Sequence, residues 1–466
     1  MQVNLLLKSI GIDCYDSREV KGVCFDSKRV KSGDIFVAKK GNKYDGNEYI
    51  KEAFNNGAVC VISDSINGDN IYKSNNIDMD RNNLVKNFYD FSNIKIIGIT
   101  GTNGKTSTAH LVYESLTNLG MYSTYIGTLG VIDREYYMAL DNTTPEIDVL
   151  ANEIVKAKNR GCKYIVMEVS SHSLSLGRVD ILDFNILGFT NLSQDHLDYY
   201  DNMEKYFLSK KSFFDNAKKE SIAIVNMDDL YAKKIINDYK GKVIGFGKKD
   251  GYKINLISND LNGLCFEIDG SIITSKLLFE TNLYNLSMCY LILKYLGINK
   301  GDITRVMKNL NVVNGRGEVL VNKDYHIILD YAHTPDAMER ILLESNKIKD
   351  NKIVTLFGCG GNRDKKKRAI MGYIASLNSD LVYICNDNPR NENEDEIIGD
   401  ITSLIKDRGN YKIIKDRKEA IRNAISKLDK GDLLLILGKG HEEYQIIGDI
   451  KYHLSDRKIV KECLEK

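Results

Sequence analysis

IKIIGITGTNGKTSTAHLVYESLTNLG, residues 94–120, is the stretch of this sequence that decides the fold. Its apolar beginning, up to Ile99, predicts a buried parallel strand. A glycine turn follows, and apolar residues then recur at steps of three and four from Ala109 to Leu119, which is one face of a helix. Gly120 is placed to end that helix.

The order of strand, glycine turn, Lys-Thr and helix is typical of phosphate binding. Glycines let backbone N–H groups approach a phosphate, the helix N-terminus favours the anion, Lys105 balances charge, and the Thr106 hydroxyl can hold Mg²⁺. The usual spacing also has a glycine five residues before Gly104, where this chain has Ile99, with Gly98 one residue earlier. An ordinary glycine turn is the alternative, but the flanking periodicities are those that a phosphate-binding loop requires.

The composition limits the class of protein. A chain of 466 residues holds about three domains, since a domain has about 150 residues. The net charge of +1 gives no reason to expect nucleic acid or an anionic membrane as a partner. The apolar runs are too short to cross a bilayer, and the N-terminus is a poor signal peptide. Nine scattered cysteines without CxxC pairs indicate reduced thiols, so we expect a cytoplasmic protein.

A second strand, 164–169, carries Glu168 near its end. A buried carboxylate has to be paired or hold a metal, and in a phosphate-binding-loop protein such a strand end holds Mg²⁺. Ser170 and His172 follow, which raises the alternative of a Ser/His hydrolase; we reject it because the nucleophile elbow G-x-S-x-G is absent. A third strand, 185–190, leads to His196, which lies between two acids.

Two further elements combine structural and chemical signals. Thr144 followed by Pro145 predicts a capped helix start, either as a cap alone or as a source of donors for an anionic ligand. The later helix from Met203 carries an apolar stripe, and Lys210 falls on this stripe while Lys211 points away. Lys210 is therefore a snorkelling side chain, or a chemically altered or charge-paired lysine in the site.

The C-terminal part predicts a second doubly wound domain. Strands at 326–329, 353–357, 381–385 and 433–437 each stop at a polar cluster, and helical segments lie between them. Arginine suits a carboxylate ligand, whereas Asp, Asn and Glu suit an ammonium group. The basic run 365–368 is interpreted as a solvated helix face and not as a nucleic-acid patch.

These motifs, in this order, resemble those of the Mur ligase family over essentially the whole chain. The matching stretches are TGTNGKT, NTTP, EVSSH, TNLSQDHLD, the lysine helix, GRGE, DYAHTPD, GCGGNRD, DNPR and GKGHE. The resemblance implies an ATP-dependent amide ligase of peptidoglycan synthesis that adds an amino acid to UDP-N-acetylmuramoyl-L-alanyl-D-glutamate through an acyl phosphate. DNPR is similar to the mark of members that add meso-diaminopimelate instead of L-lysine.

The resemblance also implies roles for individual residues. It implies ATP binding by Gly101, Thr102, Asn103, Gly104, Lys105, Thr106, Ser107 and Asn282, with Lys105, Lys210 and His196 as catalytic residues. The implied Mg²⁺ ligands are Thr106, Glu168, His196 and Lys210, the last as a carbamylated lysine. The implied muramoyl-substrate residues are Phe25, Ser27, Asn42, Lys43, Tyr44, Asn142, Thr143, Thr144, Ser170 and Arg178. The implied diaminopimelate residues are Arg363, Asp387, Asn388, Pro389, Arg390, Gly438 and Glu442.

The chain departs from the family pattern at two places. Leu176 stands where some members have a polar residue at the muramoyl-peptide site, and Phe279 and Thr281 replace the glycine and aromatic that usually precede the Asn282/Asn285 pair. From sequence alone, this asparagine pair is interpreted as a helix cap.

We therefore expect an α/β protein of three domains. These are a UDP-muramoyl-binding domain at 1–90, a central ATP-binding domain with a parallel sheet at 91–314, and a Rossmann-like amino-acid-binding domain at 315–466. We expect a monomer with no nucleic-acid or membrane partner. The alternatives are a ligase of the same fold that adds L-lysine or extends a folate-like glutamyl chain, and a regulatory NTPase without ligase chemistry.

Overall fold

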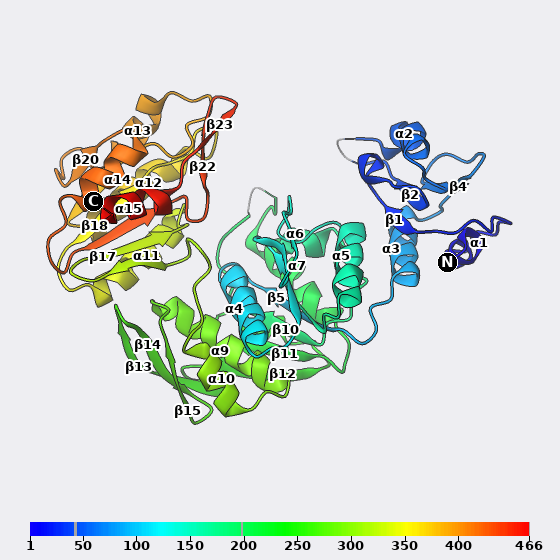
Figure 1. Cartoon of the computed structure of the whole chain (residues 1–466), viewed down its shortest axis with the longest axis horizontal. Helices are drawn as coiled ribbons and strands as arrows, with labels where there is room; N and C mark the ends of the chain where they lie inside the picture. The colour runs from blue at the N-terminus through cyan, green and yellow to red at the C-terminus, as the bar shows by residue number, and fades with distance from the viewer. Residues whose placement is uncertain (42–43, 197–198, 466) are drawn as a thin grey trace. The chain divides into compact units, whose positions relative to one another are not determined.

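The computed structural model describes residues 1–41, 44–196 and 199–465, and it is an α/β protein (Figure 1). The chain forms two compact units. Unit 1 comprises Met1–Gly251 and Leu291–Tyr295, and unit 2 comprises Tyr252–Tyr290 and Leu296–Lys466.

The helices and strands follow in chain order. Up to residue 90 they are α1 (Val3–Lys8), β1 (Gly22–Cys24), η1 (Ser27–Arg29), β2 (Asp34–Ala38), η2 (Gly46–Tyr49), α2 (Ile50–Asn55), β3 (Cys60–Ser63), β4 (Ile71–Lys73) and α3 (Ile77–Phe88). From there to residue 251 they are β5 (Lys95–Thr100), α4 (Lys105–Asn118), β6 (Ser123–Gly127), β7 (Gly130–Ile132), β8 (Tyr137–Met138), α5 (Ile147–Asn159), β9 (Tyr164–Glu168), α6 (Ser171–Ser175), β10 (Ile186–Phe189), α7 (Met203–Asp215), β11 (Ile222–Asn226), α8 (Ala232–Ile235) and β12 (Lys242–Gly247).

The remaining elements complete the chain. They are β13 (Tyr252–Asp260), β14 (Gly263–Ile268), β15 (Ser271–Ser275), α9 (Glu280–Tyr295), α10 (Lys300–Met307), β16 (Glu318–Asn322), β17 (His326–Asp330), α11 (Pro335–Ile348), β18 (Ile353–Phe357), α12 (Lys366–Asn378), β19 (Leu381–Ile384), α13 (Glu394–Thr402), β20 (Tyr411–Ile413), α14 (Arg417–Ile425), β21 (Leu433–Leu437), β22 (Tyr444–Ile447), β23 (Ile450–His453) and α15 (Asp456–Leu464).

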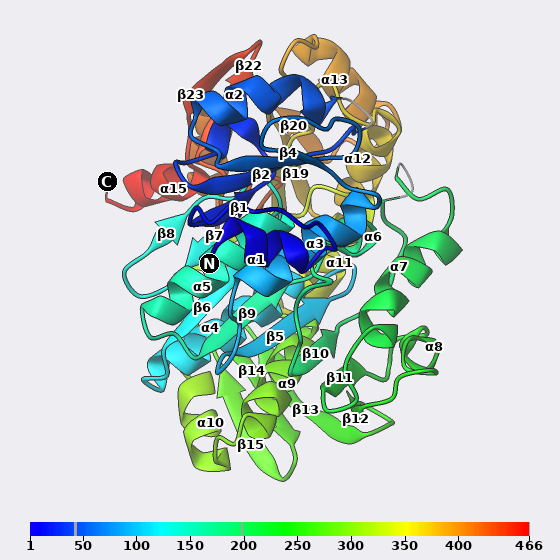
Figure 2. The same ribbon diagram turned by 90° about the vertical axis from the view of Figure 1, so that its right-hand side faces the viewer.

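The strand and helix predicted from residues 94–120 are confirmed as β5 and α4. In unit 1 the strands lie in the order β12-β11-β10-β5-β9-β6-β7-β8, parallel from β12 to β6, and Figure 2 shows β10, β5 and β9 side by side. β5 is an interior strand, which explains why every residue from Ile96 to Thr100 is buried. Its register pairs Ile99 with Glu168 and Thr100 with Phe189, so the turn after β5 lies between the ends of β9 and β10.

One local prediction is wrong. α5 begins at Ile147, with Glu146 as the preceding residue, and Thr144 does not cap it. The Thr144 hydroxyl donates instead to the Glu168 carbonyl oxygen, at 2.8 Å. The Thr144 side chain thus forms a tertiary hydrogen bond in place of the helix cap that the local sequence pattern predicted.

The sheet of the C-terminal part has helices on both faces. Its strand order is β16-β17-β21-β18-β19-β20, with all pairs parallel except β16–β17. Leu433, Leu435 and Leu437 of β21 pack in one core with α11, α12 and α13, whereas Leu434 and Ile436 pack in another with α14 and α15. This alternation confirms the predicted doubly wound arrangement.

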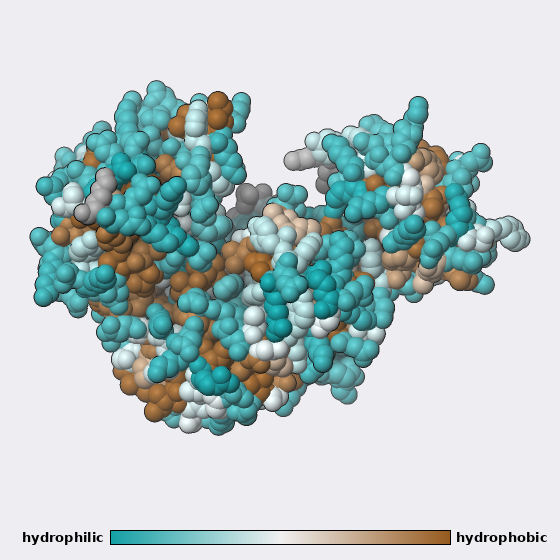
Figure 3. Space-filling model, viewed as in Figure 1, coloured by the Kyte–Doolittle hydropathy of each residue, from teal (hydrophilic) through white to brown (hydrophobic). Residues whose placement is uncertain are grey.

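Two further findings concern surfaces. None of the helices in the described ranges has the length and apolar character that crossing a membrane requires. The face drawn in Figure 3 is largely hydrophilic, and hydrophobic residues gather over the β13–β14–β15 ladder, where Ile257 and Ile272 are 57% and 61% exposed.

Candidate functional site

The turn between β5 and α4 has the backbone of a phosphate-binding loop. Gly101 and Gly104 have φ values of 148° and 83°, in the region that favours glycine. A Cβ on Gly101 would lie 1.9 Å from Thr190 Oγ1, so only glycine fits against the end of β10. The turn leads into the first residues of α4, whose backbone N–H groups have no partners within the helix.

Lys105 lies over this turn. Its Nζ donates to the carbonyl oxygens of Gly101 and Thr102, at 2.9 Å each. The next residue, Thr106, donates its hydroxyl to Glu168 Oε2 at 2.8 Å. The structure therefore brings the loop lysine, the hydroxyl and the acid of the neighbouring strand to one edge of the sheet.

Glu168 is fully buried, and its carboxylate is satisfied by hydrogen bonds. It accepts from the backbone N–H of Thr128 at 2.8 Å, from the Tyr125 hydroxyl and from Thr106. These bonds explain how an acid is tolerated in the core. The Thr106 hydroxyl and the Glu168 carboxylate supply the oxygen donors that Mg²⁺ prefers, so this corner fits that ion.

Lys210 is buried on α7, as its place on the apolar stripe predicts, with 1% exposure. Its Nζ donates to the Gly101 carbonyl at 2.9 Å and lies 4.7 Å from the centre of the Tyr206 ring. Burial, reinforced by the nearby charge of Lys105 and opposed by Asp195, places the pKa of the Lys210 amine well below its usual value. The Lys210 amine therefore loses its proton more readily than the amine of an exposed lysine.

His196 lies beside the same cluster. Its backbone has a φ of 54°, its Nε2 is 3.5 Å from Asp195 Oδ2, and its ring centre is 5.9 Å from that of Tyr206. The Tyr206 hydroxyl in turn lies 3.1 Å from Thr102 Oγ1. Among residues 1–41, 44–196 and 199–465, no three His, Cys, Asp or Glu side chains meet in a metal-binding group, so a Mg²⁺ site here needs other donors as well.

Part of the predicted muramoyl-substrate set is assembled behind Glu168. Thr144 accepts from the Ser170 backbone N–H at 3.1 Å, and Arg178 Nη1 donates to the Thr144 carbonyl at 2.9 Å. Arg178 also pairs with Glu146, and its Nε is buried without a hydrogen-bond partner in the described part of the chain. Thr143 Oγ1 lies 3.3 Å from Thr128 Oγ1, which places this set next to the phosphate-binding loop.

The remaining muramoyl-substrate residues are more dispersed. Ser27 donates to Glu52 at 2.5 Å, the Phe25 backbone N–H donates to Asp148 Oδ2 at 3.1 Å, and Asn142 and Tyr44 are exposed. Asn42 and Lys43 lie outside the described residues. A cleft of about 590 Å³ in unit 1 is lined by Lys39, Lys40, Gly41, Asp78, Arg81, Asn82, Glu146, Ser175, Leu176, Gly177 and Asp180. Leu176, one of the family departures, is thus part of this cleft wall.

The side chains of Asn282 and Asn285, both in the first half of α9, hydrogen-bond to each other and to the backbone just before the helix. Asn282 Nδ2 donates to the Leu278 carbonyl at 2.7 Å, and Asn285 Nδ2 donates to Asn282 Oδ1 at 3.0 Å. Phe279, which replaces the family glycine, has a φ of 73° although it is a buried aromatic residue. The glycine-like backbone is therefore kept without the glycine, at the cost of local strain.

In unit 2 the four predicted polar clusters follow β17, β21, β18 and β19, which are neighbours in the sheet. Asn388 Nδ2 donates to Glu442 Oε2 at 3.3 Å, and the fully buried Lys439 donates to both residues at 3.3 Å. Gly438 has a φ of 106° and lies against Asp387, whose Oδ2 is 3.2 Å from where its Cβ would be. The clusters therefore form one polar site at the carboxyl ends of the strands.

The loop 358–364 and the segment 387–392 meet at this site. Arg390 Nη1 donates to the Gly361 carbonyl at 2.9 Å, and a Cβ on Gly361 would lie 1.8 Å from the Pro389 carbonyl oxygen. Arg363 lies on the same loop and is exposed. The buried Lys439 is a residue of this site that sequence reasoning did not assign, although the GKGHE motif itself was the available signal.

Comparison with known proteins identifies the class. Residues 19–91 match the Mur ligase family, catalytic domain; residues 99–293 match the Mur ligase middle domain; and residues 315–440 match the Mur ligase, glutamate ligase domain. The chain belongs to the Mur ligase family.

Individual relatives and solved structures within the family resemble the chain over nearly its full length. The chain is 38% identical to the UDP-N-acetylmuramoyl-L-alanyl-D-glutamate--2,6-diaminopimelate ligases of Caldanaerobacter subterraneus and Aquifex aeolicus, with 96% of this chain covered in both and 95% and 94% of those proteins. A solved structure of a ligase with the same name has a TM-score of 0.75 at 28% identity, covering 100% of this chain and 99% of that one. The MurF ligase of Thermotoga maritima in complex with ADP has a TM-score of 0.63 at 20% identity, covering 96% of each chain, and shows the fold.

Proposed function

We propose that this chain is an ATP-dependent ligase that joins meso-diaminopimelate to UDP-N-acetylmuramoyl-L-alanyl-D-glutamate in peptidoglycan synthesis. One contact supports the choice of amino acid. Arg390 Nη1 donates a hydrogen bond of 2.9 Å to the carbonyl of Gly361, which lies on the same loop as Arg363. The Arg390 guanidinium, together with Arg363 on the loop that it contacts, lies on the segments that carry the Asp387–Asn388–Glu442 cluster. Arginines and acids in one site suit an amino acid that carries both carboxylate and ammonium groups. The full-length relatives that bear this name support the same assignment.

The reaction follows the acyl-phosphate route. The D-glutamyl carboxylate attacks the γ-phosphorus of ATP and ADP leaves. An amine of diaminopimelate then attacks the acyl carbon, loses a proton and displaces phosphate. Lys105 and the N–H groups from Gly104 to Ser107 neutralise and orient the phosphates, while the N–H groups of Thr102 and Asn103 donate to Asn191 and fix the shape of the turn. Catalysis is therefore chiefly positioning and electrostatic stabilisation.

The metal site draws on residues that the structure gathers around the loop. Thr106 and Glu168 would hold Mg²⁺, with His196 and a carbamylated Lys210 as further ligands. Bound Mg²⁺ supplies positive charge for the transferring phosphoryl group. An uncharged amine can add to CO₂ and release a proton, and the lowered pKa of Lys210 favours that form.

The domain boundaries, the muramoyl site and the state of the protein belong to the same proposal. The domains are 1–90 for the UDP-muramoyl substrate, 91–314 for ATP and 315–466 for the amino acid; the three family matches at 19–91, 99–293 and 315–440 support them. The buried Nε of Arg178, beside Thr144 and Ser170, is a donor available to the muramoyl substrate. Asn282 contributes to ATP binding, and the protein acts as a cytoplasmic monomer.

Phosphate release tests this function. Purified protein with ATP, Mg²⁺ and UDP-N-acetylmuramoyl-L-alanyl-D-glutamate is expected to release phosphate with meso-diaminopimelate and at a far lower rate with L-lysine or no amino acid. Release with L-lysine instead would keep the ligase class and overturn the choice of amino acid. Phosphate release at the same rate with and without any amino acid would favour the regulatory NTPase.

Arg390→Lys is expected to raise KM for diaminopimelate about 10- to 100-fold and to leave KM for ATP within about twofold. The variant keeps the positive charge but loses the planar fork, and a hydrogen bond to a charged group contributes about 1.5–3 kcal/mol. Steady-state kinetics with each substrate varied in turn measures the two constants. Arg422→Ala is the matched control, because Arg422 pairs with Glu462 between α14 and α15. Equal rises in both KM values would contradict the role of Arg390.

A further inference from the structure

Arg368, in the first turn of α12, lies in the core and not on a solvated helix face. Its side chain is 0% exposed, so the prediction for residues 365–368 is wrong at this position. A charged guanidinium without access to water is stable only if acids and carbonyl oxygens surround it. The partners of Arg368 therefore show what holds it in place.

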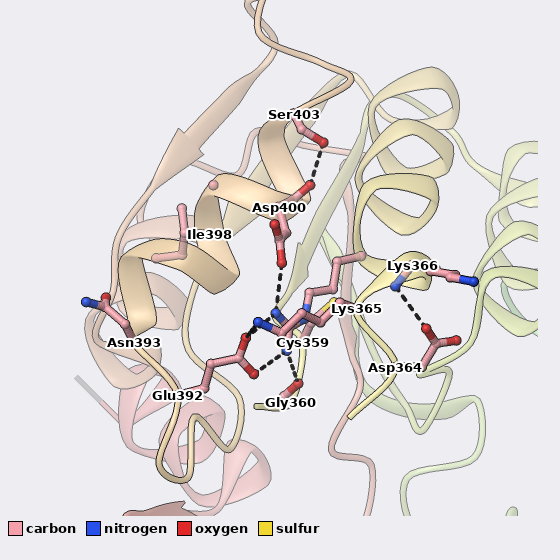
Figure 4. A network of polar contacts seen from close by, with 12 residues as sticks. Cys359, Gly360, Asp364, Lys365, Lys366, Glu392, Asn393, Ile398, Asp400 and Ser403 are labelled. Atoms are coloured by element: carbon pink, nitrogen blue, oxygen red, sulfur yellow. Dashed lines mark hydrogen bonds and ion pairs between the residues drawn. The ribbon is translucent and has the colours of Figure 1, made fainter. Parts of the chain in front are cut away.

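Three separate segments converge on this guanidinium. Glu392 forms a two-pronged ion pair with it, at 2.8 Å from Nη1 to Oε1 and 2.7 Å from Nη2 to Oε2. Asp400 on α13 lies 2.9 Å from Nη1, and the Gly360 carbonyl accepts from Nη2 at 3.0 Å. Figure 4 shows Glu392, Asp400 and Gly360 pointing toward one place from these three segments.

Two of these partners belong to the segments that carry the amino-acid site. Gly360 precedes Arg363 by three residues in the loop 358–364, and Glu392 follows Arg390 by two residues. Glu392 also accepts from the Asn362 backbone N–H at 2.9 Å, so its carboxylate joins Arg368 to that loop a second time. The ion pair with Arg368 lowers the pKa of Glu392, so this carboxylate stays charged.

The position of Gly360 shows how the contact reaches the site. Its carbonyl is held by Arg368 on one side, and on the other side a Cβ at Gly360 would lie 3.1 Å from Arg390 Nη1. A shift of Gly360 would therefore move the surface against which Arg390 packs. It would also move the loop that carries Arg363.

We propose that Arg368 is a positioning residue that sets the spacing between Arg363 and Arg390 and so determines the affinity of the site for the two carboxylates of the amino-acid substrate. Arg368 does not contact that substrate. It binds the Gly360 carbonyl and the Glu392 carboxylate at once, and so holds the loop 358–364 against the segment 387–392. This inference rests on the proposed function, because it takes diaminopimelate as the ligand of the site.

Arg368→Lys and Arg368→Met are the test variants, with Lys366→Ala on the exposed side of the same helix as the control. Both Arg368 variants are expected to raise KM for diaminopimelate about 10- to 100-fold, the usual effect of removing an outer partner of a binding group. KM for ATP is expected to stay within about twofold. Lysine should not rescue the effect, since one ammonium group cannot bridge Glu392 and Gly360 as the fork does.

Loss of folding is tested separately. Glu392→Gln keeps an acceptor for Asn362 but removes the charged pair, and it is expected to raise KM for diaminopimelate in the same direction if Arg368→Met does not fold. Lower melting temperatures with unchanged KM values, or equal rises for ATP and diaminopimelate, would overturn the inference. A wild-type protein that releases no phosphate in response to diaminopimelate would instead overturn the proposed function, which separates the two failures.

Discussion

Lys105→Ala is expected to lower kcat of the ligase reaction at least about 10²- to 10³-fold. Removing one preorganised group that stabilises transition-state charge has an effect of this size. Lys105 Nζ also donates to Gly101 and Thr102 at 2.9 Å, so the variant loses charge and loop support together. Phosphate release at saturating substrates measures kcat.

Lys95→Ala is the control for the loop variant. Lys95 is exposed at the start of β5, far along the strand from the glycine turn, and its loss is expected to leave kcat unchanged. A Lys105→Ala protein that turns over at the wild-type rate would refute the assignment of this turn to ATP.

Lys210→Met is expected to lower kcat at least about 10²-fold while raising the melting temperature. Methionine has no amine to carbamylate, so the site loses a negatively charged metal ligand and with it transition-state stabilisation of the kind that costs 10²–10³ in rate. It also removes a polar group that burial makes costly. Kinetics and thermal unfolding measured on the same preparation test both halves of the prediction.

The pH dependence of stability follows from the same residue. Because the folded-state pKa of Lys210 lies below its unfolded value of about 10.4, the unfolded chain binds more protons between those two values. Stability of the wild type prepared free of CO₂, in which Lys210 keeps its free amine, should therefore rise with pH across that window, and Lys210→Met should flatten this rise. Denaturant unfolding at several pH values measures the difference.

Carbon dioxide provides an independent readout for Lys210. Wild-type protein prepared free of CO₂ is expected to lose activity and to regain it with added bicarbonate. Lys211→Ala should behave in the same way, because Lys211 pairs with Asp215 and Asp238 on the outer side of α7. Full activity of Lys210→Met, or activity that ignores bicarbonate, would contradict carbamylation.

Features that depend on neighbours along the chain could be predicted from the sequence. The strand, turn and helix at 94–120 are confirmed because burial pattern and glycine placement are local. The four C-terminal strands are confirmed for the same reason, and so is the burial of Lys210, which follows from helical spacing.

Features that depend on distant partners could not be predicted. Thr144 reads as a helix cap until Glu168 supplies an acceptor 24 residues away. Arg368 stands in a run of lysines and reads as solvated, because its partners Glu392 and Asp400 come 24 and 32 residues later. Nothing local reveals that Phe279 keeps a glycine-like backbone, which only the fold around it imposes.

The place of β21 in its sheet has a consequence for biosynthesis. This strand is the last of the six to be made, yet it lies between β17 and β18 and hydrogen-bonds to both. A nascent chain that has emerged only to residue 430 therefore exposes two apolar strand edges with nothing between them. We expect this stage of synthesis to be the most prone to aggregation and to chaperone binding. On a ribosome stalled there, the six-stranded sheet could not form, because β17 and β18 would lack the strand that joins them.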